Sequence, residues 1–498
     1  MKSIKRVLSG LCISLILVSS SSAFAEGGDT FKMTINEDTV INNVTGLMYG
    51  INQEWSIYNA PAYYLKESSL KTDPSFIECY ENMFTLARMA GSSSQRNQWK
   101  NSVGDITERK KQTFWGITDK TRYGMVEWLR SIYDTGSKAK FTYTVNLMND
   151  TYENMADAVE FLRGDGKTNY NGGTNWAKER IKYGIKEPVD IFCFELGNEM
   201  DMEGITDPME YIRRCKLAIA AIRSVDKTTP ISAHVETRND TKSENYTKWH
   251  QSVLSEIGDS IDMLSYHNYY PVEKVVLTEK RITELRDDIK RITGSDRIKI
   301  YQSEHASQPT EFTNAAAYEY VLPHTMRGTL GTAEYFLREM WYPELIAATY
   351  HSTHSASWCV AYRDNDGIMK RTAIGSLLNM LQNNAVGEVV ESELDGFKKL
   401  EASEFMGQAI KTERGLNVIM ANVMGKDATV QFEFNNEYKL SKRLYIQSDD
   451  YKSDNYIGVR DISVAEEKIT SNEPIESYTI PKYCVMILQL EKIEEAQQ

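Results

Sequence analysis

The chain has 498 residues, a net charge of −13, a hydrophobic fraction of 41% and a charged fraction of 26%. This composition is typical of globular proteins and excludes a disordered or fibrous chain. The acidic excess argues against nucleic acids and membranes as partners, because nucleic acids and anionic lipid surfaces repel negatively charged proteins. At about 100–200 residues per domain, the length predicts more than one domain.

The first 25 residues have the features of a secretory signal peptide. A basic start at residues 2–6 precedes an apolar run at 11–18, and small residues at 23–25 supply a cleavage site. No later apolar stretch reaches the roughly 18 residues needed to span a bilayer. The sequence therefore predicts a secreted protein that is mature from about residue 26.

Between residues 44 and 385 short apolar runs alternate with longer amphipathic segments. This alternation predicts repeated strand–helix units and a parallel sheet. Eight units fit an α/β fold of the (β/α)8 or TIM barrel type, while a doubly wound open sheet is the structural alternative. The expected strands are 44–52, 83–89, 141–147, 189–196, 230–235, 261–267, 297–303 and 354–361. The expected helices include 123–133, 155–162, 208–223, 279–292 and 332–341.

After about residue 385 the pattern changes to short strands about ten residues apart, which is typical of an all-β sandwich. The expected strands are 387–394, 416–423, 428–434, 443–447 and 478–490. Residues 30–41 alternate in the same way. We therefore expect an N-terminal strand at 26–43 that joins the sandwich, a barrel at 44–385 and a C-terminal β-sandwich at 386–498.

Two of the predicted barrel strands each deliver a glutamate to the same end of the barrel. Glu199 follows strand four, and Glu304 stands at the end of strand seven, where reactive groups of such barrels are found. Glycoside hydrolysis requires two facing carboxylates, and strands four and seven favour the separation of about 5 Å that gives retention of configuration. We expect Glu304 to be the nucleophile and Glu199 the acid/base, with no metal or organic cofactor.

The Gly197-Asn198-Glu199 motif resembles that of the clan A (β/α)8 retaining glycoside hydrolases, whose acid/base and nucleophile follow strands four and seven. Within this clan the chain is most similar to the α-L-arabinofuranosidases, which pair the barrel with a C-terminal β-sandwich. The resemblance implies that Asn198 binds the hydroxyl at carbon 2 of the sugar. It also implies that Glu54, in a Tyr-Gly-x-x-x-Glu motif, holds the sugar in the reactive subsite.

Further positions are similar to the family pattern in chain order. Arg88 on strand two is followed by Trp99, and His267 and Tyr269 form a His-x-Tyr motif after strand six. The resemblance implies substrate contacts for these residues, although Arg88 could instead form a buried ion pair with a barrel acid. Trp358, expected on strand eight, is predicted to stack on a sugar ring, with barrel filling as the alternative.

Strand two departs from the arabinofuranosidase pattern, with Ala90 in place of proline, Ser92 in place of a glycine and Ser93 in place of an asparagine. These changes leave the sugar open, since xylosidases, glucuronidases and endo-acting glycanases share the scaffold. The sequence thus predicts a secreted retaining glycoside hydrolase of plant or microbial oligo- or polysaccharides, with an α-L-arabinofuranosidase as one candidate. The alternatives are an endo-acting xylanase or glucanase and, from another class, a catalytically silent carbohydrate-binding protein.

Overall fold

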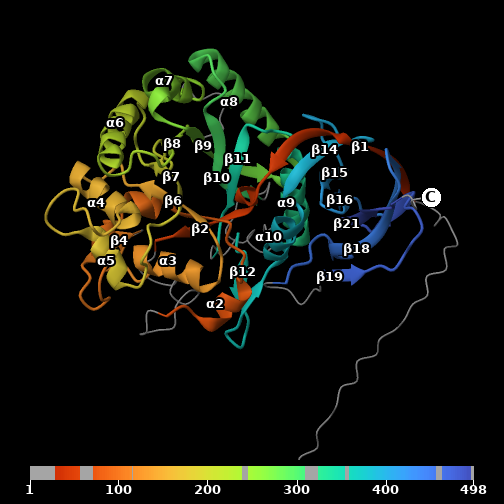
Figure 1. Cartoon of the computed structure of the whole chain (residues 1–498), viewed down its shortest axis with the longest axis horizontal. Coiled ribbons are helices and arrows are strands. Elements are labelled where there is room, and N and C mark those ends of the chain that lie inside the picture. The colour runs from red at the N-terminus through yellow and green to blue at the C-terminus, as the bar shows by residue number, and fades with distance from the viewer. Residues whose placement is uncertain are drawn as a thin grey trace, which may run out of the picture.

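A barrel and a β-sheet unit stand side by side in the computed structural model (Figure 1). The predicted signal peptide at 1–25 lies outside the described residues. Within the described part of the chain, no helix is both long and apolar enough to cross a membrane. The structure describes residues 28–55, 71–114, 116–237, 245–308, 324–353, 358–455 and 462–494.

Eight parallel strands form a closed barrel and follow one another around the ring in chain order. They are β2 (Gly50–Glu54), β3 (Leu86–Ala90), β6 (Lys140–Val145), β7 (Ile191–Leu196), β8 (Ile231–His234), β9 (Met263–Pro271), β10 (Lys299–Gln308) and β11 (Leu345–Tyr350). The ring closes where β11 pairs with β2, with Thr349 opposite Gly50. The predicted (β/α)8 barrel is therefore confirmed, and the open sheet is excluded.

Helices follow the strands along the chain, and those of the first seven strand–helix units surround the barrel (Figure 1). The side chain of Asp207 caps α6 and that of Thr325 caps α9, so each helix begins with a satisfied backbone donor. The helices are α2 (Pro74–Cys79), α3 (Met125–Asp134), α4 (Tyr152–Arg163), α5 (Trp176–Lys182), α6 (Pro208–Val225), α7 (Lys248–Ile257), α8 (Leu277–Thr293), α9 (Met326–Glu339) and α10 (Ala373–Asn384).

The eighth barrel strand corrects the sequence prediction. The sequence predicts it at 354–361, but β11 (Leu345–Tyr350) closes the ring, and Ala361 begins the hairpin strand β12 (Ala361–Arg363). Residues 354–357 lie outside the described residues. Short apolar runs cannot be assigned to strand or helix by periodicity alone. Trp358 therefore lies in the loop after strand eight and not on the strand.

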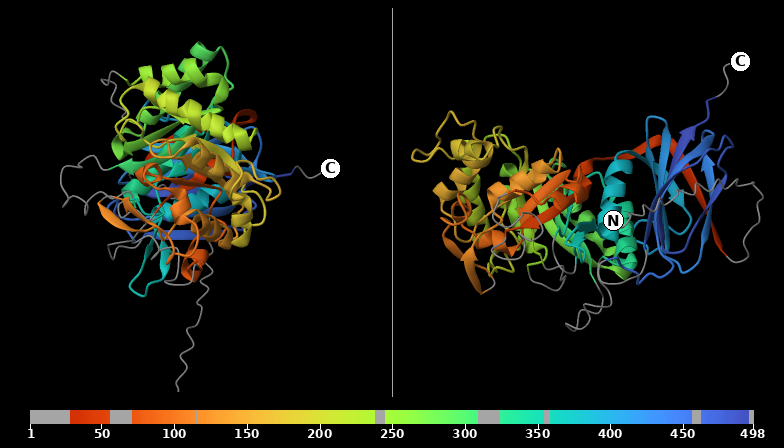
Figure 2. Two further views of the ribbon diagram at one scale, coloured as in Figure 1. Left: turned by 90° about the vertical axis from the view of Figure 1, so that its left-hand side faces the viewer. Right: turned by 90° about the horizontal axis from the view of Figure 1, so that it is seen from below.

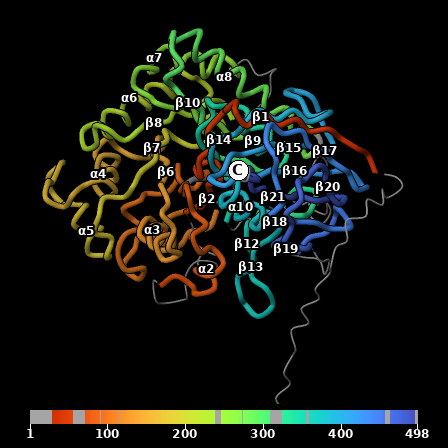
Figure 3. Tube along the Cα trace, turned by 45° about the vertical axis from the view of Figure 1, so that its right-hand side comes forward, coloured from red at the N-terminus to blue at the C-terminus, as the bar shows by residue number. Residues whose placement is uncertain are grey.

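The second unit is a nine-stranded mixed sheet in the order β19-β18-β21-β16-β15-β14-β1-β17-β20. The N-terminal strand β1 pairs antiparallel with β14 and parallel with β17, so the two ends of the chain share one sheet (Figure 3). The strands are β1 (Asp29–Val44), β14 (Gly387–Leu394), β15 (Phe405–Lys411), β16 (Gly415–Asn422), β17 (Ala428–Phe434), β18 (Tyr438–Gln447), β19 (Ser463–Lys468), β20 (Ser477–Ile480) and β21 (Cys484–Lys492).

This sheet curls until its two ends meet. Arg443 on β18 donates a hydrogen bond of 2.6 Å to the hydroxyl of Tyr478 on β20, although these strands stand near opposite ends of the sheet order. Buried side chains such as Met33, Val418 and Ile487 lie on β1, β16 and β21. The sequence predicts a sandwich, and the structure forms its all-β core from one continuous hydrogen-bonded sheet.

The helices α9 and α10 lie between the barrel and the sheet (Figure 2). Trp341, just after α9, donates its indole N–H to Gln408 of β15 at 2.6 Å. Its ring packs on Phe397 with the ring centroids 4.8 Å apart. These contacts between buried aromatic groups connect the two units.

Candidate active site

Two glutamates meet at the carboxyl ends of the barrel strands. Glu199 follows β7, and Glu304 lies in β10. One carboxylate oxygen of each lies within 4.8 Å of the other, and both lie within that distance of a ring nitrogen of His267. Glu304 is buried, whereas the side chain of Glu199 is 20% exposed. The backbone of Glu199 has a φ of +46°, a conformation that is uncommon outside glycine and often found at functional sites.

Arg88 of β3 lies beneath the two glutamates, on the barrel-interior side, and hydrogen-bonds to several side chains of the site. Its Nε donates to Oε2 of Glu195 at 2.6 Å, and its Nη1 donates to Oε2 of Glu304 at 3.0 Å. Arg88 thus forms the buried ion pair with a barrel acid that the sequence offered as the alternative, and it also contacts the predicted nucleophile. A guanidinium has five N–H donors. Its polar partners here are Glu195, Asn52, Glu304, Asn198 and His267.

The surroundings of Glu304 stabilise its ionised form. The hydroxyl of Tyr269 donates to Oε1 of Glu304, and Nδ1 of His351 lies 3.6 Å from the same oxygen. Burial raises the pKa of Glu304, but His267, His351 and Arg88, together with the Tyr269 hydrogen bond, lower it more. The net pKa lies well below the ordinary value of a glutamate, and the carboxylate is ionised as a nucleophile must be.

The hydrogen bonds of His267 define its tautomer. Nη2 of Arg88 lies 3.2 Å from Nε2 of His267, and a guanidinium can only donate. In the neutral ring Nε2 is therefore the acceptor and the proton is assigned to Nδ1, which donates to Oε1 of Glu199 at 2.8 Å in the neutral and the protonated ring alike. The other oxygen of Glu199, Oε2, is then the one that can carry a proton to a substrate.

Glu54, at the end of β2, stands near the same carboxylates. Its Oε1 lies 3.9 Å from Nε2 of His351. Burial raises the pKa of Glu54, and Glu304 and Glu199 add to the rise against the opposing effect of His351. Gly91, with a φ of +78°, makes this position possible, because a Cβ there would lie 2.8 Å from Oε1 of Glu54.

The structure brings together most of the residues that the sequence predicts for the site. Trp358 adjoins them, with its ring centroid 5.4 Å from that of Tyr269 and its indole N–H donating to the Ser307 carbonyl at 3.0 Å. The residues brought together are Glu54, Arg88, Asn198, Glu199, His267, Tyr269 and Glu304.

Trp99 is placed elsewhere. Its ring packs against Phe161 and Trp176, and its indole N–H donates to the carbonyl of Asn154 at 3.0 Å. Only 1% of Trp99 is exposed, so the structure offers no face of this ring to a sugar. The short helical turn Trp99–Ser102 holds the side chain within the core, and its predicted substrate contact finds no support here.

Sequence reasoning missed four residues around the site. His351 directly follows β11, so its position after a barrel strand would have identified it if the eighth strand had been placed correctly. Asn52 and Glu195 lie on barrel strands and face Arg88. His234 ends β8, and its ring centroid lies 4.5 Å from that of His267. Their side-chain partners depend on ring closure, for which the sequence carries no direct signal.

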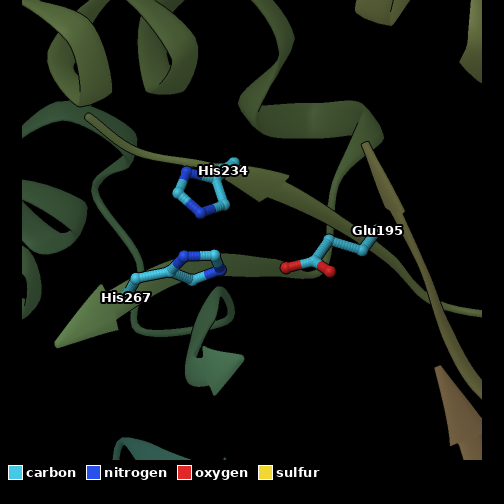
Figure 4. A group of neighbouring side chains, drawn as sticks. All are labelled: Glu195, His234 and His267. Atoms are coloured by element: carbon cyan, nitrogen blue, oxygen red, sulfur yellow. The ribbon is translucent and has the colours of Figure 1, made fainter. Parts of the chain in front are cut away.

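Glu195, His234 and His267 form a buried group beneath the site, in which the carboxylate points toward the two rings (Figure 4). One donor atom of each lies within 4.8 Å of the others, a spacing that metal ligands can have. However, Arg88 contacts both Glu195 and His267. A metal ion bound by these atoms would meet the guanidinium at close range, so the group fits Arg88 better than a cation.

Comparison with known sequences gives one family. Residues 87–287 match the profile described as the α-L-arabinofuranosidase 1 domain, a range that contains Arg88, Glu199 and His267 and ends before Glu304. An intracellular exo-α-(1→5)-L-arabinofuranosidase of Streptomyces lividans is 29% identical over 178 residues, covering 35% of this chain and 26% of that protein. The protein of the same name from Acetivibrio thermocellus is 25% identical over 256 residues, 48% of each chain.

An exo-α-(1→6)-L-arabinofuranosidase of Bifidobacterium longum is 26% identical over 199 residues, covering 38% of this chain and 35% of that one. The chain thus matches less than half the length of each of these curated relatives. Among solved structures, an α-L-arabinofuranosidase of Thermotoga maritima superposes with a TM-score of 0.76 at 16% identity, covering 93% of this chain and 100% of the other. A family 51 α-L-arabinofuranosidase of Bifidobacterium longum gives 0.78 at 15% identity, covering 93% and 99%. Likeness at such identities establishes the fold.

Proposed function

We propose that this chain, which belongs to the α-L-arabinofuranosidase family of (β/α)8 glycoside hydrolases, is itself a retaining α-L-arabinofuranosidase. The observation that carries the proposal is the carboxylate pair at the ends of β7 and β10. Oxygens of Glu199 and Glu304 lie within 4.8 Å. Retaining enzymes hold their carboxyl groups about 5–5.5 Å apart, whereas inverting enzymes need roughly 6.5–9.5 Å to admit a water.

In the first step the ionised Glu304 attacks the anomeric carbon as the glycosidic bond breaks. Tyr269 and Arg88 hold its carboxylate in place. Glu199 gives its proton, from Oε2, to the departing glycosidic oxygen, so the leaving group departs as a neutral alcohol. The product is an ester between Glu304 and the sugar.

In the second step Glu199, now ionised, takes a proton from a water molecule. That water attacks the anomeric carbon, and the carboxylate of Glu304 leaves. Two inversions give net retention, and both glutamates return to their starting states. Because His267 donates to Oε1 of Glu199, the same Oε2 serves as acid and then as base.

The substrate we propose is a terminal arabinofuranosyl unit on a plant or microbial oligo- or polysaccharide. The names of the relatives, which specify exo action on α-(1→5) and α-(1→6) arabinofuranosides, support this choice. The Nδ2 of Asn198 is buried without a hydrogen-bond partner among the described residues, so it is available to a sugar hydroxyl. We also propose export through the leader at 1–25, for which relatives named intracellular give no support.

The test is a panel of aryl glycosides (α-L-arabinofuranoside, β-xyloside, β-glucoside, β-glucuronide) with arabinan, xylan and β-glucan, run on wild type and Glu304→Gln. We expect hydrolysis of the arabinofuranoside and its loss by at least about a thousandfold in the variant. Glu344→Gln is the control, since Glu344 lies just before β11 at the opposite end of the barrel. Activity on polymers alone would favour the endo-acting alternative, and binding without turnover would favour the silent carbohydrate-binding protein.

Glu199→Ala separates the two roles within the pair. Substrates with poor leaving groups need the acid, whereas activated aryl arabinofuranosides need little help. We therefore expect a large loss of kcat/KM on arabino-oligosaccharides and a small one on a dinitrophenyl arabinofuranoside. Equal losses on both substrates would contradict the assignment of Glu199 as the acid.

A further inference from the structure

We infer that Glu195 is a positioning residue for the nucleophile: through Arg88 it fixes the place of Glu304 and takes a share of the guanidinium's positive charge. This inference rests on the proposed function, because it concerns the carboxylate that forms the sugar ester. Glu195 itself does not touch the substrate.

Glu195 is held rigidly beneath the site. Its side chain and that of Arg88 are both fully buried, and Oε2 accepts from Nε of Arg88 at 2.6 Å and from the hydroxyl of Thr144 at 3.0 Å. A buried ion pair is weak evidence for a gain in stability, because removing two charges from water costs several kcal/mol per ion. A pair at this position therefore points to a role other than stability.

The geometry of the guanidinium supplies that role. The group is planar, so an anchor on Nε determines where Nη1 and Nη2 point. Nη1 then donates to Glu304 at 3.0 Å, and Nη2 donates to Oδ1 of Asn198 at 2.9 Å. One carboxylate on β7 thereby orients two groups that act on the substrate.

Charge is the second part of the inference. Burial raises the pKa of Glu195, but the adjacent positive charge and hydrogen bond of Arg88 lower it more, so the carboxylate is ionised. Arg88 thus shares one positive charge between two carboxylates. Without the charge of Glu195, the whole positive charge would act on Glu304, which would then bind protons and carbon less strongly.

His234 does not replace Arg88 as the counter-charge. Nδ1 of His234 lies against the carbonyl of Val235, so this nitrogen carries the ring proton. Burial lowers the pKa of His234 to about 4, which leaves the ring neutral near pH 7. Its Nε2 and Oε1 of Glu195 have no hydrogen-bond partner within the described chain. Other ionisable groups near Glu195 are Cys193, Tyr211 and Tyr301.

The ester mechanism gives this charge opposite effects on the two steps. A less basic Glu304 attacks the sugar more slowly, but it also leaves the sugar more readily when water attacks. Removal of the charge at Glu195 should therefore slow formation of the ester and speed its hydrolysis. A general disturbance of the barrel would slow both steps.

The experiment is stopped-flow kinetics of Glu195→Gln with a dinitrophenyl α-L-arabinofuranoside. Glutamine keeps an oxygen acceptor for Arg88 and removes the charge. We expect the rate constant of ester formation to fall about three- to tenfold and that of ester hydrolysis to rise by a similar factor, for a nearby charge that changes pKa by about 1–3. Glu127→Gln is the matched control, because Glu127 also forms a buried pair of 2.6 Å, with Arg109, away from the site.

The outcomes separate this inference from the proposed function. A wild type without arabinofuranosidase activity would refute the proposed function. If the wild type is active but Glu195→Gln slows both steps alike, the positioning role alone is overturned. Such a result is the one expected of a control variant that is merely destabilised. If the glutamine variant does not fold, Glu195→Asp takes its place. Aspartate keeps the charge, but its shorter side chain moves the carboxylate away from Nε of Arg88, so kcat should fall. A kcat equal to that of the wild type would overturn the inference.

Discussion

Gly91→Ala is a test of whether Glu54 must stand where the structure places it. Gly91 has φ +78° and ψ 170°, a region of backbone conformation that is almost restricted to glycine. A side chain there costs on the order of 1–3 kcal/mol of stability. The added Cβ would also lie 2.8 Å from Cδ and Oε1 of Glu54, which forces the carboxyl group to move.

The effect on turnover follows from that movement. A hydrogen bond to a charged group contributes about 1.5–3 kcal/mol, so loss of one such bond from Glu54 to the sugar corresponds to about a tenfold to hundredfold fall in kcat/KM. The assay is hydrolysis of an aryl α-L-arabinofuranoside, with urea unfolding measured on the same preparations. Glu54→Gln should show a fall of the same order without the loss of stability.

Gly294→Ala is the control for backbone strain. Gly294, after α8, has a φ of +66°, and no atom lies within 4 Å of the Cβ that alanine would add. We expect a stability loss of about 1 kcal/mol with full activity. Wild-type kcat/KM in Gly91→Ala would refute the reasoning, because the Glu54 carboxyl cannot keep its position beside an added Cβ.

Three further predictions concern the buried polar groups. Tyr269→Phe removes the hydroxyl that donates to Glu304 and should lower kcat about tenfold, whereas unchanged kcat would show that this hydrogen bond does not aid turnover. Arg88→Met leaves Glu195 as a buried unpaired charge and should lower the free energy of unfolding by about 3–5 kcal/mol in urea titrations. Adding Glu195→Leu to Arg88→Met should restore much of the lost free energy of unfolding. If the losses of the two single variants simply add in the double variant, the pairing of Arg88 with Glu195 is contradicted. Burial lowers the pKa of His305 from its ordinary value of 6.5 to about 3, so the unfolded chain takes up the proton first as the pH falls. The free energy of unfolding should therefore drop by about 2 kcal/mol from this group between pH 7 and pH 5, and a His305→Asn variant with an equal drop would refute this.

Local patterns in the sequence predicted much of the fold. The strands at 387–394 and 428–434 coincide with β14 and β17. In β17 buried and more exposed positions alternate along most of the strand, so the local sequence carries the signal. Glu199, which follows β7, and Glu304, which lies in β10, were located by a different rule, namely that reactive groups of barrels stand at the carboxyl ends of strands.

Features that depend on distant pairing were missed. The run 478–490 is two strands, β20 and β21, separated near Pro481, and strands β15 and β19 were not predicted. The fivefold contact of Arg88 could not be read from its neighbours in the sequence, because its partners come from other strands of the closed ring. The orientation of Trp99 likewise depends on its packing in the core.

The position of β1 constrains the order in which the protein folds. Met33 pairs with both Leu394 and Phe432, so the first strand to leave the ribosome has no partner until β14 has been made, and its second edge stays unpaired until β17 follows. The barrel strands between them can assemble earlier, since each pairs with the next along the chain. Premature termination before β17 would leave one edge of β1 open to strands of other molecules, so such fragments should aggregate even when their barrel is complete.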